Sequence, residues 1–198
     1  MIDLCIVGSG ISGSTLANLV SKKYSIKIID KAKGPGGRVS ARRYKKFSFD
    51  HGSHHIAGVS NSFKKFLSLL QKKRLIKEWD NNIDFSLTKG DLSKKFVGTK
   101  GNNDICKFLT KDTEKKFNTE VKKINFENGV WALHTTESVI YSKALVLTCP
   151  FPQSLKLLKK YLPRKIVKLN VKMIPIITLM NVFKSTRSFP INSIRINN

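Results

Sequence analysis

The 198-residue chain has few acidic residues, little cysteine and no long hydrophobic run. Its 13 Asp and Glu residues stand against 37 Lys and Arg residues, which gives a formal net charge of +24. No apolar stretch approaches the ~18 residues that a membrane-spanning helix requires, so we expect no membrane span. The first residues show neither a basic leader nor a signal-like apolar stretch, which favours a cytoplasmic protein.

The scarcity of cysteine excludes two further classes. The sequence has no Cys-x-x-Cys pair, and its three cysteines are far apart: Cys5, Cys106 and Cys149. This spacing supports neither a disulfide framework nor a thiolate zinc site. A histidine-rich stretch (His51, His54 and His55) invites a metal hypothesis, but an extended chain would point these side chains to different faces. We therefore predict no metal site, and no nucleophile elbow of a hydrolase is present.

The excess of positive charge raises the possibility of a nucleic-acid-binding module. However, only seven of the basic residues are Arg, and the lysines are scattered along the chain as pairs. Arginine makes the bidentate contacts to phosphates and bases, and it would be expected to cluster on a binding face. We expect no specific nucleic-acid partner, and a basic binding module remains an alternative function.

The strongest signal lies in the first thirty residues. Residues 2–7 are apolar and rich in β-branched side chains, as in a buried parallel strand. A Gly-Ser-Gly-Ile-Ser-Gly turn follows at residues 8–13, and a helical pattern of leucines and valine comes next. A second β-like run over residues 25–29 ends in Asp30. This order of strand, glycine turn, helix, strand and acid is the dinucleotide-binding fingerprint.

Each residue type in this fingerprint has a physical reason. Gly8 permits the tight turn, Gly10 lets a pyrophosphate approach the backbone, and Gly13 allows the helix to lie close to the sheet. The helix N-terminus, at Ile11 and Ser12, offers free N–H groups to the phosphates. Asp30 comes 22 residues after Gly8 and can accept hydrogen bonds from a ribose. Its carboxylate makes NADP the least expected ligand, although the neighbouring Lys31 weakens this exclusion.

A second motif separates FAD from NAD. Asp30 is followed by a Gly36-Gly37-Arg38 loop, whose guanidinium can pair with a pyrophosphate. With this loop, the sequence resembles the flavin amine oxidase superfamily. Residues 49–56 (Phe-Asp-His-Gly-Ser-His-His-Ile) are similar to the Asp-x-Gly-Ala-Gln-Tyr segment of its renalase branch, and residues 95–101 and 144–153 resemble two further segments of that branch.

The resemblance implies an FAD-dependent oxidoreductase of the oxidase type. A hydride would pass from a small reduced substrate, either an amine or a dihydronicotinamide isomer, to the flavin, and O₂ would reoxidise the flavin. Because the flavin performs this chemistry, no catalytic side chain is predicted. The predicted FAD-binding residues are Gly8, Gly10, Ile11, Ser12, Gly13, Asp30, Lys31, Gly37, Arg38, Gly52, Ser53, His54 and Val121. Ser53 and His54 stand where the family has Ala and Gln, and Val121 could equally be strand core.

The rest of the pattern predicts an α/β fold, in which a Rossmann-like parallel sheet carries an inserted antiparallel β-meander and part of a substrate domain. The expected helices are residues 61–74, 103–110 and 153–162. An Asn-Gly turn at residues 128–129 predicts a hairpin. The expected strands are residues 120–126 and 130–134 of this hairpin, 138–141, 144–147 and 173–183.

By resemblance, the FAD-binding domain comprises residues 1–56 and 94–150, and a partial substrate domain comprises residues 57–93 and 151–198. Family members continue beyond this length with a closing Gly-Asp motif, so we expect the chain to be an N-terminal portion. A truncated, inactive remnant is a further alternative. The predicted partner is a small-molecule substrate, and a compound related to NAD(P)H is one candidate.

Overall fold

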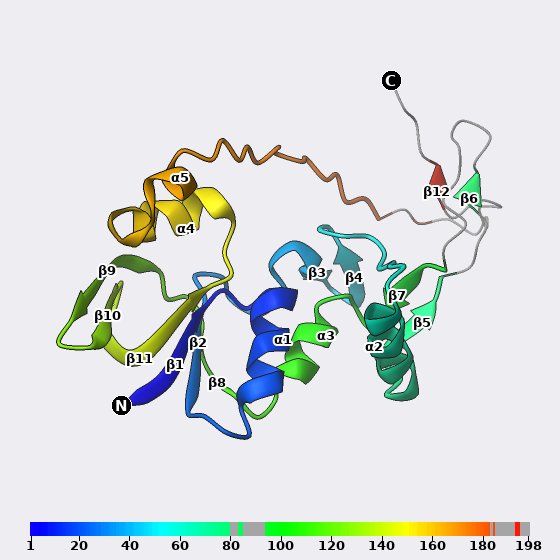
Figure 1. The fold of residues 1–198 in the computed structure, drawn as a ribbon. Coiled ribbons are helices and arrows are strands. Elements are labelled where there is room, and N and C mark those ends of the chain that lie inside the picture. Colours follow the sequence, from blue (N-terminus) through cyan, green and yellow to red (C-terminus); the bar gives the residue numbers. More distant parts are fainter. Residues whose placement is uncertain (80–82, 85–93, 183, 185–192, 195–198) are drawn as a thin grey trace.

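The computed structural model describes residues 1–79, 83–84, 94–182, 184 and 193–194. Its centre is a six-stranded, mostly parallel sheet (Figure 1). The strands lie in the spatial order β8 (Glu114–Lys116), β2 (Ile26–Ile29), β1 (Ile2–Val7), β11 (Val139–Leu147), β10 (Val130–Thr135) and β9 (Val121–Glu127). The first four strands pair in parallel, and β10 runs antiparallel to both β11 and β9. The predicted α/β fold with an antiparallel meander is confirmed.

Apolar side chains alternate between the two faces of this sheet. Ile6 and Ile28 pack with Ala17 of α1 (Ile11–Val20) on one face. Cys5 and Ile29 pack on the other face, beside α4 (Phe151–Leu158) and η2 (Lys159–Tyr161). Because a parallel strand is buried on both faces, its sequence reads as a continuous apolar run.

A second apolar cluster joins the helices outside the sheet. Leu67 and Leu70 of α2 (Asn61–Lys72) pack with Ile105 of α3 (Asp104–Leu109). Ser60 caps α2, because its hydroxyl accepts a hydrogen bond from the N–H of Phe63 at 3.3 Å. The short pair β5 (Ile76–Glu78) and β7 (Phe96–Gly98) completes this cluster. The helices predicted over 61–74 and 103–110 are thus confirmed, with slightly shorter bounds.

The remaining elements are short. A 3₁₀ turn, η1 (Gly37–Val39), leads into the hairpin of β3 (Ala41–Tyr44) and β4 (Phe47–Asp50). Helix α5 (Arg164–Val167) follows η2, and β6 (Ile83–Asp84) pairs with β12 (Ser193–Ile194). None of the helices in the described ranges has the length and apolar character needed to cross a bilayer.

Two predicted strands of the meander region are one strand in the structure. The patterns at 138–141 and 144–147 form the single nine-residue strand β11. Ser142 is the point of change, since it is paired with Trp131 of β10 on one side and with Ile2 of β1 on the other. The strand is antiparallel to its meander neighbour before this point and parallel to β1 from it onwards.

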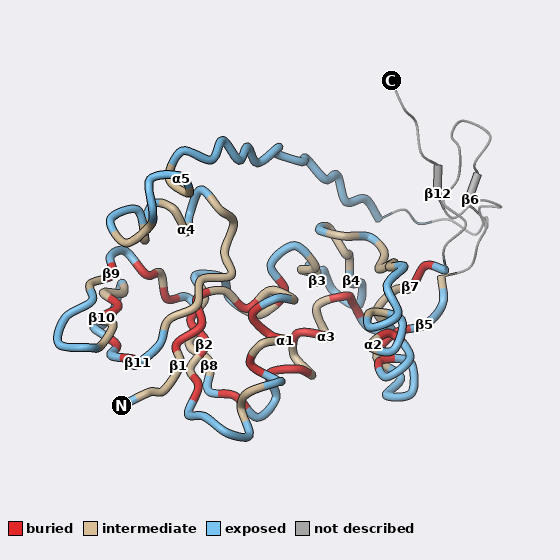
Figure 2. Tube along the Cα trace, in the orientation of Figure 1, coloured by how far each residue is buried: buried red, intermediate tan, exposed pale blue. Residues whose placement is uncertain are grey.

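The strand predicted over residues 173–183 is wrong for the part that the structure describes. Residues 173–182 are neither helix nor strand, and all of them are exposed (Figure 2). None of the described strands pairs with this segment, and a β-branched sequence forms a strand only beside a partner. Residue 183 and parts of the predicted substrate domain, at 80–82, 85–93, 185–192 and 195–198, lie outside the described residues.

Candidate nucleotide-binding site

A cavity of about 810 Å³ lies at the carboxyl ends of the parallel strands, where open α/β sheets bind their ligands. Val7 and Ile29 are the last residues of β1 and β2 in its wall, and Thr148 directly follows β11. The start of α1, the η1 loop, the entry to β9 and the first turns of α4 complete the lining. With Ser53, the cavity therefore gathers residues from five separate parts of the chain.

The glycine turn after β1 is closely packed. Gly8 has φ of +109°, a conformation that L side chains rarely adopt, and a Cβ there would lie 2.6 Å from Thr148 Oγ1. The Thr148 hydroxyl donates to the Gly8 carbonyl at 3.0 Å. A Cβ on Gly13 would lie only 2.1 Å from the Gly8 carbonyl oxygen. The absence of a side chain at Gly13 thus allows α1 to lie against the turn that ends β1, in line with the predicted close packing of helix and sheet.

Gly10 and Gly36 join the two glycine motifs of the sequence. They form an isolated parallel bridge, and the Gly36 N–H donates to the Ser9 carbonyl at 3.0 Å. Gly37, with φ of +53°, lies so close that its Cβ would be 3.2 Å from Gly10 Cα. This contact places Arg38 at the glycine turn. A Cβ on Gly10 itself would meet nothing closer than 3.7 Å, so the backbone there is open to a ligand.

Gly52 and Ser53 both contact the backbone carbonyl of Arg38. A Cβ on Gly52 would lie 2.3 Å from the Arg38 carbonyl oxygen, and the Ser53 N–H donates to that oxygen at 2.7 Å. Asn102 is fully buried, and its side chain donates to the Ser53 carbonyl at 2.7 Å. Its backbone N–H donates to Asp50 Oδ1 at 2.8 Å. The loop is therefore held by hydrogen bonds that do not involve a ligand.

Asp30 is oriented by the glycine turn. Its Oδ2 accepts from the N–H of Ser9 at 2.7 Å and from the Ser9 hydroxyl at 2.6 Å. Its Oδ1 accepts from the N–H of Ala32 at 2.9 Å. An ionised carboxylate offers about four acceptor positions, so a further donor such as a ribose hydroxyl can still bind.

The cavity wall is rich in cations. The lining contains four cationic side chains and only two carboxylates, those of Asp30 and Glu120. The cations are Lys31, Arg38, Lys122 and Lys156. The hydrogen bond from Lys122 holds the pKa of Glu120 below its usual value, and the charges of Lys31 and Lys156 act in the same direction. Such a wall attracts a polyanionic ligand.

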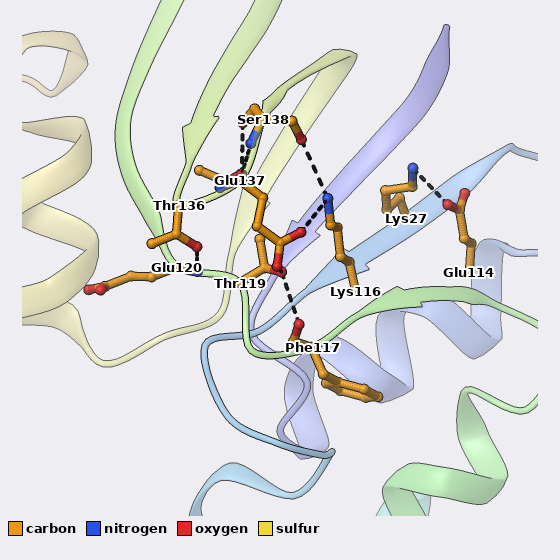
Figure 3. A network of polar contacts seen from close by, with 10 residues as sticks. Lys27, Glu114, Lys116, Phe117, Thr119, Glu120, Thr136, Glu137 and Ser138 are labelled. Atoms are coloured by element: carbon orange, nitrogen blue, oxygen red, sulfur yellow. Dashed lines mark hydrogen bonds and ion pairs between the residues drawn. The ribbon is translucent and has the colours of Figure 1, made fainter.

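Polar contacts hold the entry to β9 in place (Figure 3). Thr119, Glu120, Val121 and Lys122 of this entry line the cavity. The Thr119 N–H donates to the Asp30 carbonyl at 3.0 Å, and its hydroxyl donates to the Phe117 carbonyl at 2.9 Å. Lys116 forms an ion pair with Glu137 at 2.9 Å, which ties β8 to the meander. These contacts hold residues 119–122 beside Asp30.

Three of the predicted binding residues do not line the cavity. Gly13 and Gly52 have the packing roles described above, and His54 lies against His55 and Trp79, with ring centroids 4.6 and 6.2 Å apart. No group of histidine, cysteine and acidic side chains suited to a metal occurs among the described residues. The structure brings together the other ten: Gly8, Gly10, Ile11, Ser12, Asp30, Lys31, Gly37, Arg38, Ser53 and Val121.

The sequence prediction missed a second group of lining residues. Its members follow the carboxyl ends of β11 and β8, and such positions are themselves a signal in a parallel sheet. Cys149 is one of them, with its Sγ 3.2 Å from the hydroxyl of Ser154. The missed residues include Thr119, Glu120, Lys122, Thr148, Cys149, Gln153, Lys156 and Leu157.

Comparison with known proteins agrees with this geometry. Residues 6–71 match the family model of the NAD(P)-binding Rossmann-like domain. The matched residues include the end of β1, the glycine turn, α1 and β2. A structure from Exiguobacterium sp. 255-15, named as a protoporphyrinogen oxidase, is similar with a TM-score of 0.63 and 13% identity. An oxidoreductase from Methanosarcina mazei is similar with a TM-score of 0.55 and 14% identity.

The two structures match most of this chain but not most of their own length. The similarity covers 84% and 83% of this chain, and it covers 63% of each of the two structures. At this identity the likeness shows the fold, which is the Rossmann-like α/β architecture that the sheet order also gives.

Proposed function

We propose that this chain functions as a cytoplasmic, renalase-like, FAD-dependent oxidoreductase. The observation that carries the proposal is one cavity that joins the glycine turn, Arg38 and Asp30. The proposed reaction transfers a hydride from an amine or a dihydronicotinamide isomer to the flavin, and O₂ then reoxidises the flavin. In the same proposal, residues 1–56 and 94–150 form the FAD-binding domain, and residues 57–93 and 151–198 contribute to substrate binding.

The N-terminus of α1 fits a pyrophosphate. Gly10 is its N-cap, and no side chain donates or accepts a capping hydrogen bond there. The first N–H groups of a helix need partners, and phosphate oxygens satisfy them where the helix dipole also favours negative charge. Arg38 stands in the same wall and can pair with phosphate oxygens in a bidentate manner.

The adenosine half has its own candidate contacts. Asp30 can accept from the ribose, because its carboxylate is already aimed by Ser9 and keeps acceptor capacity. Val121 lines the cavity next to Lys122, where an adenine could lie against the entry to β9. This arrangement gives each part of a dinucleotide a chemically suitable partner.

Bound FAD would supply the hydride-accepting chemistry. The chain's own residues would bind and orient it: the α1 N–H groups and Arg38 would hold the phosphates, and Asp30 would accept hydrogen bonds from the ribose. The walls of the cavity from α4 and from the turn between β11 and α4 would limit the access of water. No side chain is assigned a role as acid, base or nucleophile.

A flavin-retention experiment tests the proposal. The full chain is incubated with FAD, desalted, and examined for the visible flavin absorption band; we expect close to one flavin for each chain. Gly10→Val should abolish retention, because its side chain would occupy the space of the pyrophosphate. The backbone of Gly10 is extended, and its Cβ position meets only ordinary contacts, so the variant should fold.

Gly34→Val is the matched control. A Cβ on Gly34 meets nothing within 4 Å, so this variant should fold and retain FAD. A wild-type protein that stays colourless after incubation would refute the proposal, as would retention of NAD⁺ in preference to FAD.

The redox half of the proposal needs a separate measurement. Under anaerobic conditions, the flavin band of the loaded protein should bleach on addition of an amine or a dihydronicotinamide isomer. Air should restore the band and yield peroxide. A chain that retains FAD but is reduced by neither substrate class would instead support the inactive-remnant alternative.

A further inference from the structure

Asn102 is a buried polar residue that lies one hydrogen bond away from the wall of the cavity, and it is not among the predicted binding residues. It belongs to the turn that joins β7 to α3 (Figure 1), and it is fully buried. A buried carboxamide needs partners for both its donor and its acceptor, because an unpaired polar group in the interior is costly. The partners of Asn102 therefore show which parts of the chain it holds together.

Both ends of the Asn102 carboxamide bind main-chain groups of other segments. Its Oδ1 accepts from the Gly98 N–H at 2.7 Å, and its Nδ2 donates to the Ser53 carbonyl at 2.7 Å. The backbone N–H of Asn102 donates to Asp50 Oδ1 at 2.8 Å. Leucine has neither a donor nor an acceptor in its side chain, and ionised aspartate has no donor. No other side chain of this size can therefore make both side-chain bonds.

The turn that begins at Gly98 leaves Asn102 little freedom to move. A Cβ on Gly98 would lie 2.6 Å from the Asn102 nitrogen, so the close approach of the two backbones requires glycine. Gly98 is also the last residue of β7 and pairs with Ile76 of β5. The acceptor end of the carboxamide is thus anchored to a strand pair, and its donor end fixes the position of Ser53.

Ser53 connects this anchor to Arg38. The Ser53 carbonyl accepts from Asn102, and the Ser53 N–H donates to the Arg38 carbonyl at 2.7 Å. The Ser53 hydroxyl donates to the His55 carbonyl at 2.6 Å, so the link to Arg38 is made by main-chain atoms alone. Ser53 and Arg38 line the cavity. A shift of the Ser53 backbone would therefore move the Arg38 loop within the wall.

We propose that Asn102 is a positioning residue for the cofactor, and that it acts through Ser53 on Arg38. This inference rests on the proposed function, since it takes the pyrophosphate of FAD to lie beside Arg38. None of the hydrogen bonds of the Asn102 side chain reaches Asp30 or Val121, the contacts proposed for the adenosine half. Loss of the carboxamide should weaken the hold on the pyrophosphate and leave the adenosine contacts intact.

Titration of the full chain with FAD and with AMP tests this role. Asn102→Leu should weaken FAD binding at least about ten-fold, because the Ser53 carbonyl loses its donor. AMP carries the adenosine half without the pyrophosphate, and it should bind within about two-fold of the wild type. Asn102→Asp is the milder variant, since it keeps an acceptor for the Gly98 N–H and loses only the bond to Ser53. It should show the same pattern, and it keeps the test decisive if Asn102→Leu does not fold.

A double-mutant cycle separates positioning from a general loss of stability. Arg38→Gln alone should weaken FAD binding, because it removes the bidentate donor. In that background, Asn102→Asp should weaken binding by less than about two-fold further, since Asn102 acts through Arg38. Two independent effects would instead multiply.

Thr110→Val is the matched control for the loss of a buried hydrogen bond. Thr110 is fully buried, as Asn102 is, and its hydroxyl donates to the Cys106 carbonyl of α3 at 2.8 Å. The variant should lower the free energy of unfolding in urea and leave FAD binding within about two-fold of the wild type.

The inference and the proposed function fail in different ways. A wild-type chain that binds no FAD would refute both of them. A wild-type chain that binds FAD, with an Asn102→Asp variant that binds it equally well, would refute only the role of Asn102. Equal losses of FAD and AMP binding, multiplying losses in the double-mutant cycle, or an equal loss in Thr110→Val would also overturn it, because each would assign Asn102 to general stability.

Discussion

Asp30 accepts two hydrogen bonds from Ser9 through one carboxylate oxygen, at 2.7 Å from its N–H and 2.6 Å from its hydroxyl. Ser9 is fully buried. The end of β2 is therefore fastened to the turn that follows β1, before any ligand binds. The acid that the sequence assigns to a ribose thus has a second role in shaping the glycine turn.

Replacement of Asp30 should affect both stability and binding. Asp30→Ala leaves the buried Ser9 donors without their acceptor, and we expect a loss of about 2 kcal/mol in the free energy of unfolding. FAD retention should fall at least ten-fold. Ser9→Ala removes one donor only and should cost about 1 kcal/mol. Urea unfolding and FAD titration of both variants check this, and a larger loss in Ser9→Ala would contradict it.

The sign of the change in the free energy of unfolding caused by Gly13→Ala tests how tightly α1 packs against the glycine turn. Alanine in a helix normally stabilises relative to glycine by up to about 1 kcal/mol. Here its Cβ would lie 2.1 Å from the Gly8 carbonyl, so we expect destabilisation by about 3 kcal/mol. Gly34→Ala, with free space at its Cβ, should change stability by less than about 0.5 kcal/mol. A stabilised Gly13→Ala protein would show that α1 can move away from the turn.

The three cysteines should differ in reactivity. Burial raises the pKa of Cys5 to about 12 and that of Cys106 to about 11, so both thiols stay protonated and inaccessible at neutral pH. Cys149 is partly exposed and lines the cavity. A thiol reagent should label one site, FAD should slow that labelling, and Cys149→Ser should abolish it. Labelling that FAD leaves unchanged would place the ligand elsewhere.

Asp50 should make stability depend on pH. Burial raises its pKa, an effect that the hydrogen bond from the Asn102 N–H opposes. A carboxyl group with a raised pKa binds its proton more tightly in the folded state. Its contribution is therefore most favourable at pH below the ordinary value of 3.8, and it is lost as pH rises through the raised pKa.

Asp50→Asn removes this titration and keeps an acceptor for Asn102. The difference in free energy of unfolding between variant and wild type should therefore move in favour of the variant as the pH rises from acid to neutral. Urea unfolding across that range measures it. Asp112→Asn, at a side chain that is 79% exposed, serves as the control and should show a flat difference.

The sequence correctly predicted the helices, strands and turns that are determined by interactions between residues close together in the chain. The strand–turn–helix at residues 2–20 carries its own periodicity and glycines, and the Asn128-Gly129 turn fixes its hairpin. The continuity of β11 could not be predicted in this way. It depends on Ser142 meeting β10 on one side and β1 on the other, which are partners distant in sequence.

The candidate site shows the same contrast between residues that a local turn positions and residues that distant parts of the chain position. The fingerprint predicted Gly10 and Asp30, whose neighbours are set by the turn itself. Lys122 and Lys156 reach the cavity only because the meander and α4 fold over the strand ends, so no pattern around them indicates it. The strand predicted over residues 173–183 failed for a related reason, because β-branched residues do not specify a partner strand.

The shared strand β11 also has a mechanical consequence. Because one continuous backbone belongs to both the meander and the parallel sheet, pulling the meander apart strips β1 of a neighbour. The meander and the parallel sheet therefore cannot fold or unfold independently of each other. A chain break between Ser142 and Lys143 would cut a central strand of the sheet. Amide protons on both sides of that point should exchange with solvent in a single cooperative opening.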